Sequence, residues 1–166
     1  SMAIGQGELL LTPIQMANIS AIIANRGFYF TPHILKSIEG NEKIDTTFLE
    51  KKYTTINPKH FNIIIEGMEK VIKKTDGTAN NIKSNSISIC GKTGTAQNPH
   101  GEDHSIFIAF APKENPEIAI AVYIENGGWG STWAAPIAGL MIEKYLKVDV
   151  NLDVERFITN GVINKR

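Results

Sequence analysis

The sequence predicts an α+β domain in which helices cover both faces of an antiparallel sheet. Three runs, at residues 87–95, 105–110 and 118–124, have the β-branched and aromatic composition of strands, and the turn-forming segment APKENPE joins the last two as a hairpin. Apolar side chains occupy both odd and even positions of these runs, so the sheet needs cover on both sides. Helical patterns before and after the runs can supply it.

Composition excludes several classes of protein. The 166 residues, 42% hydrophobic and 20% charged, are enough for one domain with a core. Seventeen basic residues balance seventeen acidic ones, which favours neither a nucleic acid nor an anionic membrane surface as a partner. The single cysteine excludes an intrachain disulfide. No apolar run approaches the roughly 18 residues of a membrane span, so we expect the chain as given to be soluble.

The first helix has clear start and stop signals. Thr12 can cap it, with Pro13 at the first helical position and Gln15 reaching back to the cap. The body, residues 14–24, is apolar around most of its circumference, which is typical of a helix buried inside a larger structure. Gly27 is expected to end it in the left-handed conformation.

An extended segment at residues 28–39, interrupted by Pro32, should follow, and Asn57 and Pro58 announce the second helix. Glu66 and Lys70 can pair across one of its turns. Its predicted buried stripe consists of Phe61, Ile64, Ile65, Met68 and Val71.

The last helix is predicted at residues 132–146, with Pro136 tolerated in or near its first turn. Its predicted apolar face consists of Ile137, Leu140, Met141 and Tyr145. Residues 147–166 are more polar and lack a clear period, so we expect a partly ordered tail there and place the domain at residues 1–146.

The segment GKTGT lies at the end of the first predicted central strand. Lys92 and Thr93 offer an ammonium and a hydroxyl to an anionic group, and Gly94 removes a Cβ from the approach of a ligand. Thr95 can offer its backbone N–H to a developing oxyanion. The same residues would also suit a solvated turn, and a Lys-Thr-Gly triplet alone is weak evidence for a binding site. Its context therefore has to decide.

The order of strand, KTGTAQ, strand, loop, strand and terminal helix resembles the second half of the transpeptidase domain of penicillin-binding proteins and serine β-lactamases. The segment AIGQGELLLTPIQMANISAIIANRG is similar to the GQG and TPIQMA helix region of class B penicillin-binding proteins. DGTA at residues 76–79 and FIAFAP at residues 107–112 resemble the family's turn before the motif strand and its next strand. The IGQG form is more similar to the elongation type, penicillin-binding protein 2. The resemblance covers residues 3–146.

The resemblance implies a peptidoglycan D,D-transpeptidase. In that family a serine of an S-x-x-K motif attacks the penultimate D-Ala of a stem peptide, and an amine of a second stem peptide resolves the acyl-enzyme into a cross-link. Carried onto this sequence, Lys92 would supply positive potential and Thr93 would bind the terminal carboxylate. Gly94 would keep the strand edge open, Thr95 would supply an oxyanion N–H and a second hydroxyl, and Gln97 would flank the groove.

The nucleophile of the family has no counterpart in these residues. None of the eight serines is followed by Lys three residues later, or by Asn or Asp two residues later. The chain therefore resembles a carboxyl-terminal piece of the domain, and we expect it neither to react with penicillin nor to turn over peptide alone. The alternative is a non-catalytic module that uses the same strand for substrate binding or protein interaction.

The resemblance also implies partners and a location. Stem peptides and β-lactams would bind the parent protein, which would lie in the bacterial inner membrane, face the periplasm and work with the cell-wall elongation machinery. We expect no cofactor, no metal and no nucleic acid. A piece of the domain should expose apolar surface and a free sheet edge, which favours self-association.

Other reactive side chains have simpler interpretations. HGEDH at residues 100–104 could be drawn as a metal site, but it lies in a Gly-containing loop without a helix to align ligands, and we expect a polar loop near the cleft. Cys90 lies in an apolar strand, as inert core cysteines do. Ser105 and His104 are adjacent on a strand and should face opposite sides, which disfavours a catalytic dyad. ENGGWGSTW is expected to form a flexible rim, with Trp129 and Trp133 packed or lining the groove.

Overall fold

The computed structural model of the chain describes residues 6–35 and 46–163. Residues 36–39, the last part of the predicted extended segment, lie outside the described residues. In the described part of that segment only Phe28–Tyr29 forms a strand, β1, which pairs with β2 (Lys52–Tyr53).

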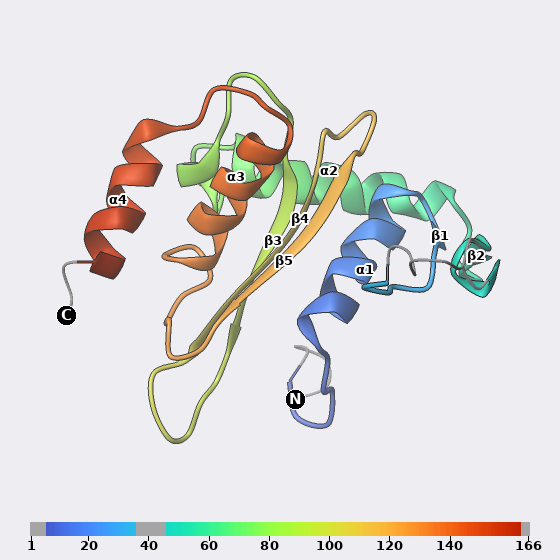
Figure 1. Ribbon diagram of the computed structural model, residues 1–166, viewed down its shortest axis with the longest axis horizontal. Coiled ribbons are helices and arrows are strands. Elements are labelled where there is room, and N and C mark those ends of the chain that lie inside the picture. Colours follow the sequence, from blue (N-terminus) through green and yellow to red (C-terminus); the bar gives the residue numbers. More distant parts are fainter. Residues whose placement is uncertain (1–5, 36–45, 164–166) are drawn as a thin grey trace, which may run out of the picture.

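The centre of the fold is an antiparallel sheet of β3 (Cys90–Ala96), β4 (His104–Ala111) and β5 (Ile118–Ile124), in the order β3-β4-β5. Cα partners such as Thr93 with Phe107, and Phe107 with Val122, set the register. Figure 1 shows the three strands side by side. The predicted strands and the β4–β5 hairpin are confirmed, although β3 begins at Cys90 rather than at residue 87.

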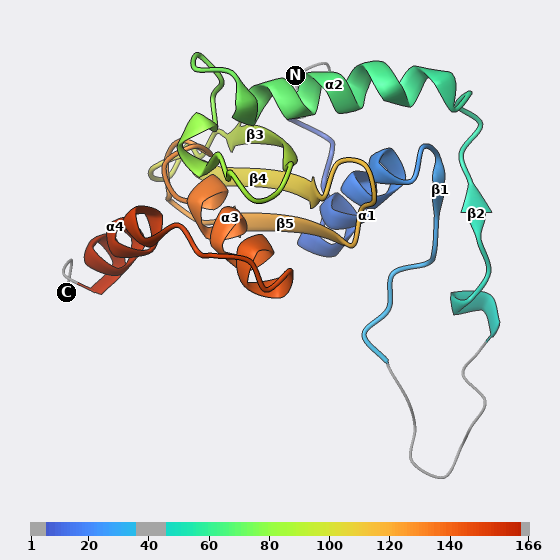
Figure 2. The same cartoon turned by 90° about the horizontal axis from the view of Figure 1, so that it is seen from above.

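Helices cover both faces of this sheet, as predicted. Figure 1 shows α3 (Ala134–Tyr145) to the left of the strands and α1 (Pro13–Ala24) to their right. Helix α2 (Lys59–Lys73) shares the core of α1 against Cys90 and Phe110, and Figure 2 shows it beside β3. The remaining described elements are two short 3-10 helices, η2 (Thr46–Phe48) and η3 (Asn80–Ile82), and a final helix, α4 (Leu152–Ile163).

The ends of α1 follow the local sequence signals. The Thr12 backbone N–H donates to Gln15 Oε1 at 2.8 Å, which satisfies a donor that the helix itself leaves free. At the other end Gly27 has a φ of 110°, and its N–H donates to the Ile22 carbonyl at 2.9 Å. The predicted start is therefore confirmed, whereas the left-handed conformation begins one residue before Gly27, at Arg26, which has a φ of 57° and follows the C-cap Asn25.

The core on the α3 side packs sheet residues such as Phe107 and Ile120 against Ile82 and Ile142. The predicted apolar face of α3 is wrong, because Met141 is 52% exposed and Tyr145 60% exposed. The helix instead buries a face of small residues together with Ile142, namely Ala134, Ala135, Pro136, Ala138 and Gly139. Small side chains are needed there because the backbone lies close to its neighbours: a Cβ on Gly139 would be 3.1 Å from Ile82 Cβ.

The core on the other face joins α1 and α2 to Cys90 and Phe110 of the sheet. Phe61, Ile65 and Met68 of the predicted α2 stripe are buried, but Ile64 is 50% exposed. Ile72 is buried instead, because positions 61, 65, 68 and 72 share one face of a helix, and it joins the core on the α3 side.

The predicted pairing of Glu66 with Lys70 is replaced by a long-range one. Glu66 and Glu69 of α2 lie 3.5 and 2.8 Å from Lys113 Nζ, in the β4–β5 turn. The short hydrogen bond between Glu69 and Lys113 is the main reason why the pKa of Glu69 is lowered and that of Lys113 is raised.

The carboxyl-terminal segment contains more regular structure than its sequence period indicates. Asn151 Oδ1 accepts a hydrogen bond from the Val154 N–H at 3.2 Å, as a helix cap does, and α4 follows. The rings of Trp133 and Phe157 stack with centroids 5.2 Å apart, which attaches α4 to the start of α3. Across the described residues, none of the helices has the length and hydropathy needed to cross a membrane.

Large apolar side chains are exposed in several places, including Leu10 at 88% and Ile34 at 96%. Within the described residues, β3 and β5 each have one edge without a strand partner. Both features match the predicted open surface, and self-association, to be measured by sedimentation, stays a prediction.

Candidate functional site

The residues of the KTG motif lie on β3, an edge strand of the central sheet. Lys92 is exposed, and Thr93 and Thr95 are partly accessible. Among the described residues, β4 is the only strand that pairs with β3, so one side of the β3 backbone faces outward. The structure thus places the predicted side chains on an accessible strand edge rather than on a helix or in the core.

Strand alternation sends the ammonium and the two hydroxyls to opposite faces. Thr93 and Thr95 pair with Phe107 and Ser105, whose side chains lie on the α3 side: Phe107 is in that core, and Ser105 Oγ accepts from the Ala134 N–H of α3. Lys92 belongs to the opposite face, the side of α1 and α2. Its Nζ bends back to donate to the Thr93 carbonyl at 2.7 Å. The Lys92 ammonium and the Thr93 hydroxyl therefore lie on opposite faces of β3. They come together only at the outer backbone edge of this strand, where an anion could contact both groups.

Two partners of this edge come from distant segments. Thr78 Oγ1 lies 3.1 Å from Thr93 Oγ1, and Gln6 Nε2 donates to the Thr95 carbonyl at 3.2 Å. In the sequence, Thr78 and Gln6 stand out only as members of the DGTA and GQG segments, and nothing there predicts that either residue contacts β3. Gln97 follows the end of β3 and is exposed.

The Gly-rich loop after β5 packs directly on the motif strand. A Cβ on Gly130 would collide with the carbonyl oxygens of Gly94 and Ile106, so this position needs glycine. Trp129 beside it is 73% exposed, whereas Trp133 stacks on α4. The loop is therefore a close-packed rim, and one of its two tryptophans faces solvent.

Ser105 and His104 have separate structural partners. Ser105 is fully buried, its Oγ donates to the Trp129 carbonyl at 2.9 Å, and it accepts from the Ala134 N–H at 3.2 Å. His104 Nδ1 accepts from the Asn126 N–H at 3.1 Å, and its ring packs on Tyr123 with centroids 5.3 Å apart. The two side chains serve different contacts, in agreement with the predicted absence of a dyad.

The other candidates show no arrangement for chemistry. Within the residues that the structure describes, no group of three or more His, Cys, Asp or Glu side chains could hold a metal ion. Asp103 of HGEDH instead accepts a hydrogen bond from the Asn98 N–H at 3.1 Å, within its loop. Cys90 is fully buried, and desolvation is the main cause that raises its thiol pKa to about 12.

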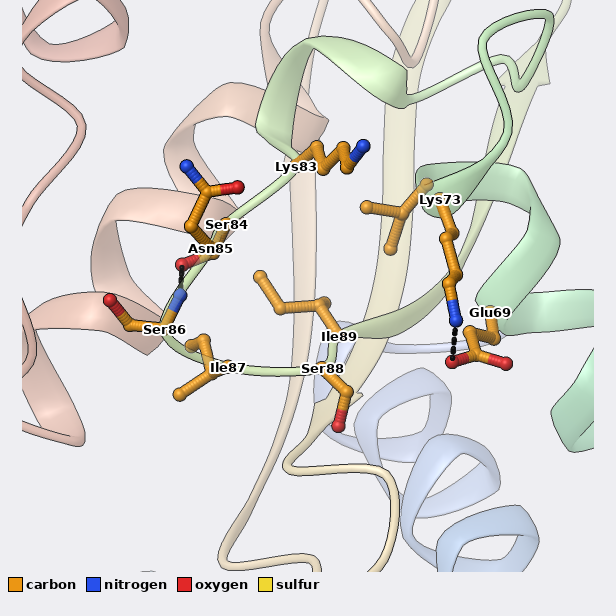
Figure 3. A pocket seen from close by; sticks show the side chains of 10 residues that line it. Glu69, Lys73, Lys83, Ser84, Asn85, Ser86, Ile87, Ser88 and Ile89 are labelled. Carbon is orange, nitrogen blue, oxygen red and sulfur yellow. Dashed lines mark hydrogen bonds and ion pairs between the residues drawn. The ribbon is translucent and has the colours of Figure 1, made fainter.

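A cavity of about 280 Å³ lies beside the segment that leads into β3. Figure 3 shows Lys73 directed toward Glu69, 3.5 Å away, and Lys83 on the facing segment. The lining residues are Glu69, Ile72, Lys73, Lys83, Ser84, Asn85, Ser86, Ile87, Ser88 and Ile89. None of the predicted site residues is among them.

The family model of the penicillin binding protein transpeptidase domain matches residues 1–143 of the chain. The chain belongs to this family. The relatives and solved structures that resemble it include penicillin-binding proteins of the PBP2/MrdA type, as the IGQG form predicted.

Two relatives illustrate the similarity in sequence. The peptidoglycan D,D-transpeptidase MrdA of Haemophilus influenzae is 34% identical over 164 residues, which cover 88% of this chain and 25% of that protein. The peptidoglycan D,D-transpeptidase PbpA of Mycolicibacterium smegmatis is 34% identical over 161 residues, covering 87% of this chain and 31% of the relative. The chain thus spans about a quarter to a third of the length of these relatives.

Two solved structures show the same fold. Pseudomonas aeruginosa PBP2 in complex with WCK 5153 aligns with a TM-score of 0.76 at 34% identity, over 92% of this chain and 34% of that one. Helicobacter pylori PBP2, solved in a complex with MreC, aligns with a TM-score of 0.66 at 30% identity, over 88% of this chain and 26% of that one.

Proposed function

We propose that this chain forms the KTG-strand wall of a peptidoglycan D,D-transpeptidase site. The observation that carries the proposal is the accessible edge of β3, where the Lys92 ammonium lies beside the backbone of Thr93. An ammonium and hydroxyl groups along an open strand edge suit an extended peptide that ends in a carboxylate. The relatives named as peptidoglycan D,D-transpeptidases supply the reaction class.

Each motif residue has a distinct role in this proposal. The Thr93 hydroxyl donates to the terminal carboxylate of the stem peptide, and the Lys92 ammonium adds positive potential. The Thr95 N–H stabilises the oxyanion that forms when the carbonyl is attacked, and its hydroxyl is a second donor to the carboxylate. Gly94 leaves the approach open, and Gln97 borders the groove.

We infer that the acylating serine of the full site is not one of these 166 residues, because none of their serines has the S-x-x-K spacing. The chain alone should therefore not acquire a covalent adduct from a fluorescent penicillin. Mass spectrometry of the treated chain tests this, and an adduct on any serine would refute it.

The whole protein is proposed to face the periplasm from the bacterial inner membrane and to bind stem peptides and β-lactams. A partnership with the cell-wall elongation machinery is proposed because the Helicobacter pylori PBP2 relative was solved in a complex with MreC.

Binding of a carboxylate-terminated peptide tests the proposed role of the strand. In ¹⁵N NMR spectra, N-acetyl-D-Ala-D-Ala should shift the amide signals of Thr93 and Thr95 at lower concentration than its carboxamide analogue does. Thr93→Val should remove most of that preference. Equal affinity of the unmodified chain for the two peptides would refute the carboxylate role.

A further inference from the structure

Thr78 is the one residue outside β3 whose hydroxyl contacts a motif hydroxyl among the described residues. Its Oγ1 lies 3.1 Å from Thr93 Oγ1, and either atom can be the donor in the absence of a ligand. Fifteen residues of sequence separate the two. The contact lies at the surface, so a ligand at the β3 edge can reach the Thr93 hydroxyl.

The turn that carries Thr78 is held firmly against α2. Gly77 lies so close to the Val71 carbonyl that a Cβ would collide with it. The Ala79 N–H donates to the same carbonyl at 3.0 Å, and Ala79 is fully buried. Asn80 Nδ2 donates to the Ile72 carbonyl at 3.0 Å. Contacts on both sides of Thr78 therefore keep its hydroxyl beside β3.

The proton count of the pair decides what Thr78 can do. A threonine hydroxyl has one proton to donate and can accept through its oxygen. When Thr93 donates its proton to a carboxylate, its oxygen is left to accept, and Thr78 is placed to supply that proton. Hydrogen bonds arranged in such a chain polarise one another, which strengthens the terminal donor.

We propose that Thr78 is a positioning residue that donates to Thr93 Oγ1 and thereby directs the Thr93 proton toward a carboxylate at the β3 edge. This inference rests on the proposed carboxylate role of Thr93. It extends that role by assigning part of the ligand selectivity to a turn outside the motif. Hydrogen bonds to ionised acceptors are the stronger class, so a fixed donor favours a carboxylate over a neutral carboxamide.

The test compares four variants of the 166-residue chain in the same NMR titrations with N-acetyl-D-Ala-D-Ala and its carboxamide. Thr78→Val keeps the shape but removes the hydroxyl, and should lower the carboxylate preference by about fivefold, the loss expected for one hydrogen bond. Thr78→Ser retains the hydroxyl and should restore most of the preference. Thr75→Val is the matched control, because the exposed Thr75 side chain has no hydrogen-bond partner among the described residues. Thr93→Val reports on the proposed function itself.

The outcomes separate the two claims. Loss of preference in Thr78→Val and Thr93→Val, with retention in Thr78→Ser and Thr75→Val, supports the inference. An unchanged preference in Thr78→Val beside a lost one in Thr93→Val overturns the role of Thr78 and leaves the proposed function standing. An unchanged preference in Thr93→Val overturns the carboxylate role, and the inference falls with it. Loss in Thr75→Val equal to that in Thr78→Val also overturns the inference, because the effect would then belong to the turn as a whole.

Discussion

Replacing Ser105 with alanine should loosen the junction between β4, the Gly-rich loop and the start of α3. Its hydroxyl donates to the Trp129 carbonyl at 2.9 Å and accepts from the Ala134 N–H at 3.2 Å. Alanine removes both bonds at once and leaves only a small space. The effect should therefore come from polar groups that lose their partners rather than from a cavity.

The two groups that lose Ser105 differ in whether another hydrogen-bond partner remains. The Trp129 carbonyl also accepts a hydrogen bond from the Thr132 N–H at 2.9 Å, so it keeps a partner, and losing the bond from Ser105 should cost about 1 kcal/mol. Ala134 is fully buried, so its N–H is left without a partner at the first residue of α3, which costs about 1–2 kcal/mol. The sum is roughly 2–3 kcal/mol. For a chain of this length that corresponds to a decrease in Tm of roughly 5–10 °C.

Thermal and urea unfolding followed by circular dichroism measure this change. Ser131→Ala is the matched control, since Ser131 lies in the same loop but its side chain makes no hydrogen bond within the described part of the chain; it should alter stability by less than about 0.5 kcal/mol. A Ser105→Ala variant as stable as the unmodified chain, or a Ser131→Ala variant equally destabilised, would show that the hydroxyl does not hold this junction.

Three further changes have expected outcomes. Gly130→Ala should cost about 1–3 kcal/mol and shift the β3 amide signals in NMR, because its Cβ would meet the Gly94 carbonyl; an unperturbed β3 would contradict the close packing. Glu69→Gln should cost about 1 kcal/mol at pH 7, because it breaks the ion pair with Lys113. The lowered pKa of Glu69 means that its contribution is present at neutral pH and is lost as pH falls through that pKa, so the urea midpoints of the two proteins should converge in acid, and a difference independent of pH would refute this. The thiol pKa of Cys90 is raised to about 12, so Cys90 should resist iodoacetamide at pH 8 in the folded chain and react with it in urea. Fast labelling of the folded chain would contradict the burial of Cys90.

Elements with strong local signals were predicted well. The cap of Thr12 and Gln15 and the stop of α1 within one residue of Gly27 depend on residues a few positions apart, so they can be predicted without knowing the rest of the fold. The apolar runs of β4 and β5 likewise show a sheet that needs cover on both faces.

Predictions that depended on neighbouring elements were less successful. The buried face of α3 was predicted from its large side chains, but the helix lies too close to η3 for large residues at Gly139. Helix α4 was missed because its cap, Asn151, precedes a sequence of weak period, and its attachment through Trp133 and Phe157 is a tertiary contact.

The sequence by itself determined that Lys92, Thr93 and Thr95 occur together at a strand and which chemistry such side chains can offer, because residues next to one another in a strand have a known alternation. Only the tertiary structure decided that this strand is at the edge of the sheet and that Thr78 and Gln6 are its neighbours. The physical reason is the distance along the sequence. Backbone geometry fixes the relation between residues within one turn or strand, whereas a hydrogen bond between residues 15 or 89 positions apart depends on how helices and strands pack.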